Sequence, residues 1–421
     1  MHLKKLELKN FRNYTGLNVE FLKNTILIFG DNGQGKTNLL ESIYYLSSGK
    51  SHRTSNQDEL IKWGTEFSLI RAEADSRLVE LEFRAGNSLK IKVDRVMCRK
   101  KSEFINIIPA VLFTPDDLKI IKGSPSNRRE FLDDLLERIY PGYQALRLQY
   151  QKILNQRNSL LKSIDSPAKA KENLTFEVWN ENLAKHGSEI IKKRSDLVSE
   201  MRHNFCYYMK AFFPDFTSGI QYVYSWDRKL SDFQAASAES DRSGANGTVT
   251  PSADRTGENI LKDSALSQEP SQNPVTEKDT KTDIAIIKQK FLEKLDENLP
   301  KEISYRTTVT GPHRDDFIVT FGEKDIRSFG SQGQQRAASV SLKFCELEEI
   351  REKTMKNPVL LLDDILSELD LKREKIVLDL IKDKYQTFIT TSNINYVSHI
   401  EETGKDRVQE LVVKENSISK K

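Results

Sequence analysis

The stretch TILIFGDNGQGKTNLLESIYYLSS, residues 25–48, decides the fold of this 421-residue chain. It opens with a short apolar run that ends directly at Gly30, which is typical of a buried strand. A glycine-rich loop follows, and beyond it leucine, isoleucine and tyrosine recur at helical spacing. Strand, loop and helix in this order indicate an α/β domain that binds phosphate at the loop.

The loop GDNGQGKT, Gly30 to Thr37, fits the pattern G-x-x-x-x-G-K-[ST] in full. The glycines let backbone N–H groups face phosphate oxygens, the lysine reaches the β- and γ-phosphates, and the hydroxyl binds Mg²⁺. We therefore predict a nucleoside triphosphate and Mg²⁺ as ligands, with Thr37 on the metal. The predicted nucleotide-binding residues are Gly30, Asp31, Asn32, Gly33, Gln34, Gly35, Lys36, Thr37 and Asn38.

A second apolar strand, PVLLLDD at 358–364, ends in two carboxylates. At the carboxyl edge of a parallel sheet Asp363 would hold Mg²⁺, directly or through water. Asp364 follows immediately and is the predicted catalytic residue, because its carboxylate can point past the metal and polarise the attacking water. A purely capping role for Asp364 stays open.

The stretch FGSQGQQRAASVSLKF, residues 329–344, contains a further helix start, which we call the signature turn at residues 330–334. The helix predicted from Gln334 buries one face through Ala337, Val340, Phe344 and Leu347. Its N-terminus favours an anion, with Ser331 as a hydroxyl donor and Gly333 allowing close approach. An ordinary capped helix start is the alternative.

The remaining segments suggest two lobes. FSLIRAEA, RLVELEFRA and LKIKVDRV alternate with period two and predict an antiparallel meander beside the first sheet. From Asn127 the pattern is helical, after which ISYRTTVTG (303–311) is predicted as a strand and YQTFITTS as a buried strand. The predicted organisation is an ATPase lobe at 1–126 and 301–421, interrupted by a helical lobe at 127–300.

Residues 232–283 are rich in Ser, Thr, Asp, Glu, Pro and Gly and contain one aromatic residue, so we predict a disordered insertion. They hold ten acidic and five basic side chains, a net charge of −5. Because the whole chain has a net charge of +3, the remaining residues carry +8. A basic folded part is compatible with a nucleic-acid partner without requiring one.

Several classes of protein are disfavoured by composition. The three cysteines are far apart and lack CxxC spacing, and the six histidines are scattered, so neither a disulfide framework nor a zinc site is indicated. No apolar run approaches the ~18 residues of a membrane span, and the first residues carry charges where a signal peptide is apolar. We therefore expect a cytoplasmic protein without a membrane partner.

The order of P-loop, helical lobe, signature turn, strand ending in Asp-Asp and SELD (367–370) resembles the heads of ABC-type ATPases. In that superfamily the signature of one head covers the nucleotide bound by the other. The resemblance implies that Ser331, Gly333 and Gln334 contact nucleotide in trans. One P-loop and one signature per chain then imply an ATP-dependent homodimer.

More specific motifs resemble the RecF family. They are HLKKLELKNFRNY at 2–14, SHRT at 51–54, LFTPDDLKIIKGSPSNRREFLD at 112–133 and GPHRDDF at 311–317. The resemblance covers nearly the whole chain except 232–283 and implies that Arg12, Asn13 and Arg53 lie near the nucleotide. For GPHRDDF a buried turn is at least as good an interpretation, and Gln335 and Arg336 are equally well read as ordinary helix residues.

RecF-family membership implies an ATP-dependent DNA-binding clamp of recombinational repair and replication. Such a clamp dimerises on gapped or single-stranded DNA, works with RecR and RecO to load the RecA recombinase, and supports the SOS response. ATP hydrolysis, expected as a weak DNA-dependent activity, releases it.

Two departures from the ABC pattern predict slow turnover: Asp364 replaces the usual glutamate, and Thr390, Thr391 and Ser392 stand where a histidine is usual. A motor subunit of another ABC-type ATPase is the alternative function. A head with long coiled-coil arms is disfavoured by the short helical lobe, and a small-molecule kinase by the signature turn.

Overall fold

The computed structural model describes residues 2–226, 277–392, 408–414 and 417–420. The chain divides into two compact units: the first comprises Met1–Arg147, Lys193–Tyr222 and Asp316–Lys421, and the second Leu148–Lys192 and Val223–Asp315. The first unit thus includes parts of the segment 127–300, which the sequence analysis assigned to a helical lobe. In the described residues no helix combines the length and the apolar character needed to cross a membrane.

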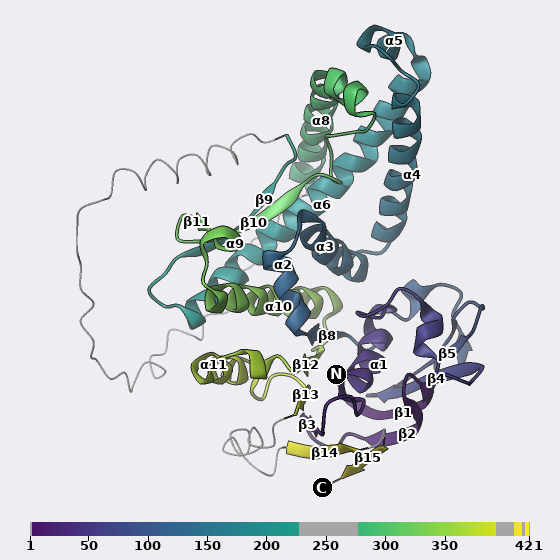
Figure 1. The fold of residues 1–421 in the computed structure, drawn as a ribbon, viewed down its shortest axis with the longest axis vertical. Helices are drawn as coiled ribbons and strands as arrows, with labels where there is room; N and C mark the ends of the chain where they lie inside the picture. Colours follow the sequence, from purple (N-terminus) through teal and green to yellow (C-terminus); the bar gives the residue numbers. More distant parts are fainter. Residues whose placement is uncertain (1, 227–276, 393–407, 415–416, 421) are drawn as a thin grey trace. The chain divides into compact units, whose positions relative to one another are not determined.

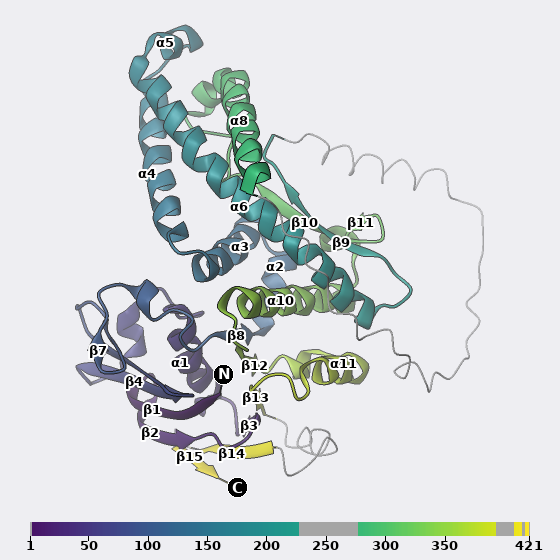
Figure 2. The ribbon, with the colours of Figure 1, turned by 180° about the vertical axis from the view of Figure 1, so that it is seen from behind.

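The P-loop strand lies inside a six-stranded sheet of the first unit with the order β15-β14-β3-β13-β12-β8. All neighbouring pairs are parallel except β14 and β15. In Figure 2 the strands follow one another in this order from bottom to top. Their bounds are β3 Thr25–Phe29, β8 Ala110–Phe113, β12 Val359–Asp363, β13 Thr387–Thr391, β14 Val408–Lys414 and β15 Ser417–Lys420. The predicted buried strands of a mostly parallel sheet are confirmed.

A second six-stranded sheet has the order β2-β1-β4-β5-β6-β7 and is antiparallel throughout. Buried and exposed residues alternate along its longer strands, as the period-two patterns predicted. The bounds are β1 Leu3–Phe11, β2 Tyr14–Glu20, β4 Phe67–Ala74, β5 Arg77–Arg84, β6 Lys90–Val93 and β7 Val96–Met97. The predicted meander is therefore correct, and β1 and β2 extend it.

Helix α1, Lys36–Ser48, joins the two sheets into one core. It contacts β8, β12 and β13 of the parallel sheet and β4 of the antiparallel one (Figure 1). Leu39, Leu40, Ile43 and Leu46 of α1 are fully buried among apolar side chains of both sheets. The position of the P-loop is therefore fixed by the best-packed part of the first unit.

The other elements of the first unit frame this core. Helix α10, Gln332–Thr354, contacts β8, α2 and α3, and its predicted apolar stripe is buried. A three-stranded sheet has the order β11-β10-β9. The bounds are α2 Leu118–Lys122, α3 Pro125–Ile139, α9 Ile326–Phe329, α11 Leu371–Ile381, β9 Ser218–Val223, β10 Asp316–Phe321 and β11 Lys324–Asp325, with 3₁₀ turns at Gln57–Leu60, Lys101–Glu103, Pro115–Asp117 and Leu366–Glu368.

The second unit is helical. It consists mainly of residues 148–161 of α4 (Tyr143–Leu161), α5 (Pro167–Glu172), residues 174–192 of α6 (Leu174–Phe212) and α8 (Glu277–Tyr305). Leu161, Ile164, Ala170, Phe176 and Leu299 form its small apolar cluster. Close packing continues at Gly187, where a Cβ would lie 2.5 Å from the ring of Phe291.

The strand predicted at 303–311 is wrong, because α8 continues to Tyr305 and no strand follows before β10 in the described chain. The backbone N–H groups of Thr308 and Val309 donate to the side chains of Asn158 (2.8 Å) and Glu302 (2.9 Å), so they need no neighbouring strand. Of the predicted insertion 232–283, residues 232–276 lie outside the described residues, and 277–283 belong to α8.

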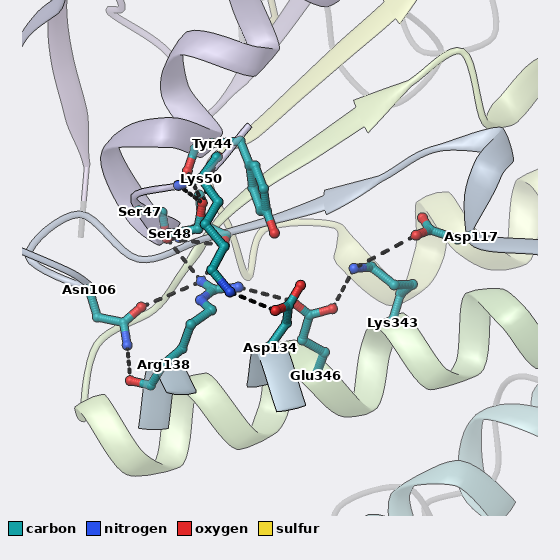
Figure 3. A network of polar contacts seen from close by, with 11 residues as sticks. Tyr44, Ser47, Ser48, Lys50, Asn106, Asp117, Asp134, Arg138, Lys343 and Glu346 are labelled. Atoms are coloured by element: carbon teal, nitrogen blue, oxygen red, sulfur yellow. Dashed lines mark hydrogen bonds and ion pairs between the residues drawn. The ribbon is translucent and has the colours of Figure 1, made fainter. Parts of the chain in front are cut away.

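A polar network ties α1 to α10 through Arg138 of α3 (Figure 3). The Arg138 guanidinium donates to Glu346 of α10 at 2.9 Å, to Ser47 of α1 at 2.9 Å and to the Ala110 carbonyl of β8 at 2.6 Å. Burial alone would lower the pKa of Lys343, but Glu346 next to it raises that pKa on balance. These buried charges are paired, so they fix the spacing of the two helices instead of weakening the core.

An ion pair closes the interior of the second unit. Arg157 and Glu302 lie 2.7 Å apart with both side chains fully buried. The guanidinium also donates to Asn180 (2.7 Å) and Thr308 (2.7 Å), and it lies 4.9 Å from the ring centroid of Phe176. Because neither charge is in contact with water, each charge of the pair is compensated mainly by the other.

We predict that Arg157→Met lowers the free energy of unfolding by about 3–5 kcal/mol, because Glu302 is left buried without its cation. Urea unfolding followed by circular dichroism measures the change. The matched control is Lys169→Met, which breaks an exposed pair with Asp165 and should cost at most about 1 kcal/mol. Equal effects of the two substitutions would show that the buried pair is not a stabilising element.

Candidate functional site

The P-loop folds tightly because two of its glycines leave no space for a side chain. A Cβ at Gly30 would lie 2.3 Å from the Val413 carbonyl oxygen of the neighbouring strand. Gly35 has φ +109° and caps α1, and a Cβ there would lie 2.8 Å from Asn13 Nδ2. The Tyr14 hydroxyl donates to the Gly35 carbonyl at 3.0 Å. The loop is thus held against β14 and against the β1–β2 turn.

The side chain of Lys36 points back into the P-loop. Its ammonium donates to the carbonyls of Gly30 (2.6 Å) and Asp31 (3.0 Å), and the residue is only 5% exposed. Asp31, Asn32 and Gly33 at the loop's tip are exposed, and Gln34 is half-buried. The loop therefore presents accessible backbone around a preplaced cation, as phosphate binding requires.

The structure brings the predicted metal residues together from distant parts of the chain. Thr37 Oγ1 donates to Asp363 Oδ1 at 3.1 Å. The same oxygen accepts a bond from Thr390 Oγ1 at 2.8 Å. Thr390 belongs to β13, the strand between β3 and β12, and its hydroxyl links β13 to the end of β12 through the Leu362 carbonyl and Asp363.

These residues fit Mg²⁺. Burial raises the pKa of Asp363, an effect only partly offset by the bonds from Thr390 and Thr37, and Asp364 nearby adds to it. A buried carboxylate held by hydroxyls is stabilised by an added cation, and hydroxyl and carboxylate oxygens are ligands that Mg²⁺ prefers. Among the described residues there is no cluster of three or more His, Cys, Asp or Glu that could hold a metal. Water and phosphate oxygens would complete the coordination of Mg²⁺.

Asp364 occupies an uncommon backbone conformation beside this site. Its φ is +51°, its backbone N–H donates to Thr390 Oγ1 at 3.0 Å, and its carbonyl accepts from Ser367 Oγ at 2.6 Å. Burial raises the pKa of its half-buried carboxyl, while the Lys36 charge lowers it. The charge of the P-loop lysine therefore acts on this carboxyl group.

Arg12, Asn13 and Arg53, expected near the nucleotide, contact residues in the first two turns of α1. Asn38 Nδ2 donates to Asn13 Oδ1 at 2.8 Å, and Arg53 Nη1 donates to Asn38 Oδ1 at 2.7 Å. Arg12 binds Glu41 of α1 with two bonds of 2.8 and 2.6 Å. The amide of Asn38 is therefore fixed on both sides.

The signature turn has the geometry of a capping box. The Ser331 hydroxyl accepts from the Gln334 backbone N–H at 3.3 Å, and Gln334 Oε1 accepts from the Ser331 N–H at 2.8 Å. Helix α10 therefore begins at Gln332, two residues before the predicted start. Ser331 and Gln332 are exposed, and Gly333 is half-buried. The turn is rigid and accessible.

Side chains after the signature turn anchor it. Gln335 is buried and donates to the carbonyls of Ile326 (3.0 Å) and Arg327 (3.1 Å). Arg336 pairs with Glu368, and its Nη2 lies 2.5 Å from Glu368 Oε2. Gln335 and Arg336 are thus structural, and Arg336 links the turn to the SELD segment that follows Asp364.

The GPHRDDF segment is a buried turn in its first part. A Cβ at Gly311 would lie 2.6 Å from the Phe291 ring. His313 Nδ1 and the Tyr150 hydroxyl are 2.7 Å apart, and Asp315 accepts from the Ser225 backbone N–H at 2.7 Å. Asp316, in the first unit, binds Arg128 of α3 through bonds of 2.6 and 2.8 Å. The side chains of His313, Asp315 and Asp316 therefore make contacts within the fold.

Sequence reasoning missed three residues of the site: Thr390, Glu41 and Tyr14. Thr390 was noted only as a replacement for a histidine, yet it contacts both aspartates. Glu41 is fully buried on α1, and a lone acidic residue in an apolar helix face was the signal available for it. Tyr14 gave no signal, because its bond to Gly35 depends on tertiary packing.

Comparison with known proteins agrees with this geometry. The family model described as RecF/RecN/SMC N terminal domain matches residues 2–419. The DNA replication and repair protein RecF of Natranaerobius thermophilus is 36% identical over 400 residues, 94% of this chain and 92% of that protein. The protein of the same description from Bacillus cereus strain G9842 is 36% identical over 409 residues, 96% of this chain and 95% of that one.

A solved structure shows the same fold. The recombination mediator protein RecF-ATPrS in the RecFOR pathway has a TM-score of 0.75 and 30% identity, and the match covers 100% of this chain and 98% of that chain. With the parallel and antiparallel sheets described above, this likeness confirms the predicted ABC-type ATPase head. This chain belongs to the RecF family.

Proposed function

We propose that this protein is an ATP-gated DNA-binding clamp of replication and recombinational repair. The observation that carries the proposal is the joining of Lys36, Thr37 and Asp363 into one site, in a unit that also exposes the rigid Ser331 turn. Relatives similar over nearly the whole chain are described as DNA replication and repair proteins. The same comparisons favour this function over a motor subunit of another ABC-type ATPase.

ATP is the proposed ligand of the P-loop. The neighbouring solved structures carry ATP or ATPrS in their descriptions. Lys36 and the loop N–H groups would bind the phosphates, while Thr37 and Asp363 would hold Mg²⁺, which neutralises charge on the phosphate oxygens. Asn38 and the P-loop residues 30–35 complete the proposed nucleotide-binding set.

Hydrolysis is proposed to be slow. Asp364 is the residue proposed to accept a proton from the attacking water, because it directly follows the proposed Mg²⁺ ligand Asp363 and its carboxyl is half-buried. The aspartate side chain is shorter than the glutamate usual in ABC ATPases, so its carboxylate reaches less far towards the γ-phosphate. ATP binding is then the main signal, and hydrolysis resets it.

Dimerisation is proposed to follow ATP binding. Ser331, Gly333 and Gln334 lie at the N-terminus of α10, whose dipole favours a phosphate, and the exposed Ser331 hydroxyl could donate to it; a second copy of the chain would present that phosphate. The Arg336–Glu368 pair connects this turn to the loop that carries Asp364. Closing the dimer would thereby influence the hydrolytic residue.

DNA, preferably gapped or single-stranded, is the proposed partner of the dimer. RecR and RecO are the proposed protein partners, since a neighbouring structure is described as part of the RecFOR pathway. Loading of the RecA recombinase and support of the SOS response would follow from that pathway. These activities take place on the chromosome, so we propose a cytoplasmic location.

The proposal is tested by measuring affinity for gapped DNA with ATP, with ADP and without nucleotide. We expect tight DNA binding only when ATP is present. DNA affinity should also fall steeply as the salt concentration rises, because lysine and arginine contacts to phosphate release counterions. Lys36→Met should abolish the ATP effect, whereas Lys384→Met, an exposed lysine in the same unit, should retain it. DNA affinity that depends neither on the nucleotide nor on the salt concentration would refute the proposed ATP-gated clamp.

Asp364→Asn should preserve ATP binding and lower the rate of ATP hydrolysis by about 10²–10⁴-fold, because the general base is lost. Steady-state phosphate release measures the rate. Asp383→Asn is the matched control, since Asp383 also has a positive φ of 59°. An unchanged rate in Asp364→Asn would assign this residue to a structural role.

Ser331→Arg should leave ATP affinity unchanged and abolish ATP-dependent dimerisation, because the larger side chain occupies the proposed interface. Analytical ultracentrifugation with and without ATP reports the dimer. Ser124→Arg makes the same change in another exposed capping box, at the start of α3, and should dimerise normally. Dimers of normal affinity in Ser331→Arg would mean that the signature turn does not act in trans.

A further inference from the structure

A strongly basic hairpin ends the antiparallel sheet. It consists of β6, a two-residue turn and β7, and β7 is the outermost strand of that sheet (Figure 2). With the residues that follow, its sequence is KIKVDRVMCRKK at 90–101, which holds six basic side chains and one acidic side chain. The net charge of this short segment, +5, exceeds the +3 of the whole chain. We refer to residues 90–101 as the basic hairpin.

The tip of the basic hairpin is a tight turn that its single acidic residue holds in place. Asp94 and Arg95 have φ of +50° and +69°, as in the two-residue turns that join hairpin strands. The Asp94 carboxylate accepts from the Leu78 backbone N–H at 2.9 Å and lies 2.7 Å from Arg77 Nε. The negative charge of Asp94 is thus used by β5 and does not neutralise the cations of the hairpin.

The segment after β7 is fixed in a similar way. The Cys98 N–H donates to the Ile91 carbonyl at 2.9 Å, which continues the pairing of the two strands. Glu103 Oε1 accepts from the backbone N–H groups of Lys100 (2.9 Å) and Arg99 (3.2 Å). The carboxylate of Glu103 therefore holds the backbone, and the side chains of Arg99 and Lys100 project from an ordered turn.

Four cations of the basic hairpin are exposed and make no ion pair within the part of the chain that the structure describes. They are Lys92, Arg95, Arg99 and Lys100. Glu80 lies opposite Lys92 in the register of β5 and β6, but its carboxylate is 2.7 Å from Arg71 Nη2 instead. The hairpin therefore presents uncompensated positive charge on a rigid support.

Protection of the sheet edge does not account for this composition. Lysines on an edge strand often prevent it from pairing with another sheet. Arg95, Arg99 and Lys100, however, lie in the turn and after the edge strand. The edge strand itself carries two apolar side chains, Val96 and Met97, which are 68% and 52% exposed. A protective edge would not combine exposed apolar residues with cations placed beside the strand.

We propose that the basic hairpin is a contact surface for DNA, with its cations on phosphates and with Val96 and Met97 against the sugars or unstacked bases between them. The inference rests on the proposed function and names a part of the chain that touches the DNA. Arginine binds phosphate through paired N–H groups, and apolar side chains such as methionine pack against sugars and base steps.

A protein partner fits the basic hairpin less well. A stable protein interface buries roughly 800 Å² on each side around an apolar centre, and two apolar side chains at a sheet edge supply little of that. Contacts to phosphate provide affinity without an apolar centre, because they release counterions. The charge and the small apolar area together favour a nucleic-acid backbone over an acidic protein.

The test measures the affinity for a fluorescein-labelled gapped duplex with ATP at several salt concentrations. The double variant Arg95→Gln with Arg99→Gln should bind more weakly. Its plot of log affinity against log salt concentration should be shallower by about 0.7–0.9 for each arginine, the slope expected for one phosphate contact. Lys382→Gln with Lys384→Gln removes the same charge from another exposed segment of the first unit and should leave the slope unchanged.

Crosslinking provides a second readout that does not require a loss of affinity. Met97→p-benzoylphenylalanine places a photoreactive group on β7, and ultraviolet light should link it to the DNA when ATP is present. Met355→p-benzoylphenylalanine is the matched control, because Met355 is an exposed methionine of the same unit (88% exposed) outside the basic hairpin. Position 355 should give no crosslink.

The outcomes separate the hairpin contact from the proposed function. If the wild-type protein shows no ATP-dependent affinity for DNA, the proposed function fails. If the wild type binds DNA and the arginine double variant keeps its affinity and slope, the hairpin contact alone is refuted, and an acidic protein becomes the better partner. Equal losses in the arginine and lysine variants would also refute the contact, as would crosslinks of equal yield from positions 97 and 355.

Discussion

The parallel pairing of β3, β13 and β12 is the constraint on which the site depends. In this register Asp363 lies level with Thr390, and Thr390 lies level with Ile28, two residues before Gly30. The Thr390 hydroxyl can therefore reach Asp363, while the P-loop returns Thr37 to the same carboxylate. A slip of one residue in β12 would turn Asp363 to the opposite face of the sheet and dismantle the site.

Buried polar contacts extend this constraint to the signature helix. Arg138 binds Ser47 near the end of α1 and Glu346 of α10, so the helix that begins at the P-loop and the helix that begins at Ser331 share one anchor. At its N-terminal end α10 is attached through Arg336 to Glu368, four residues after Asp364. The helix start at the P-loop and the helix start at Ser331 are thus held in one rigid framework, which the proposed two-chain ATP switch would need.

Sequence patterns predicted the elements that are specified by residues close together in the sequence. The P-loop, the strands at 25–29 and 359–363 and the stripe of α10 follow from apolar periodicity and glycine spacing. The contacts of Thr390, Glu41 and Arg138 could not be predicted, because each is a polar side chain buried by residues distant in sequence. The error at 303–311 has a related origin: β-branched residues suggested a strand, but side chains of Glu302 and Asn158 satisfy the backbone there.

The geometry around Asp364 is suited to a switch more than to a fast enzyme. A left-handed φ at a residue other than glycine is costly, and here the Thr390 and Ser367 hydroxyls maintain it. These bonds fix the backbone of Asp364, whose carboxylate, shorter than that of a glutamate, would act on water in the proposed reaction. Because a clamp must stay closed for as long as its partners need the DNA, selection for a long ATP-bound state would favour this arrangement. Slow hydrolysis is then a property of the proposed clamp and not a defect of an ATPase.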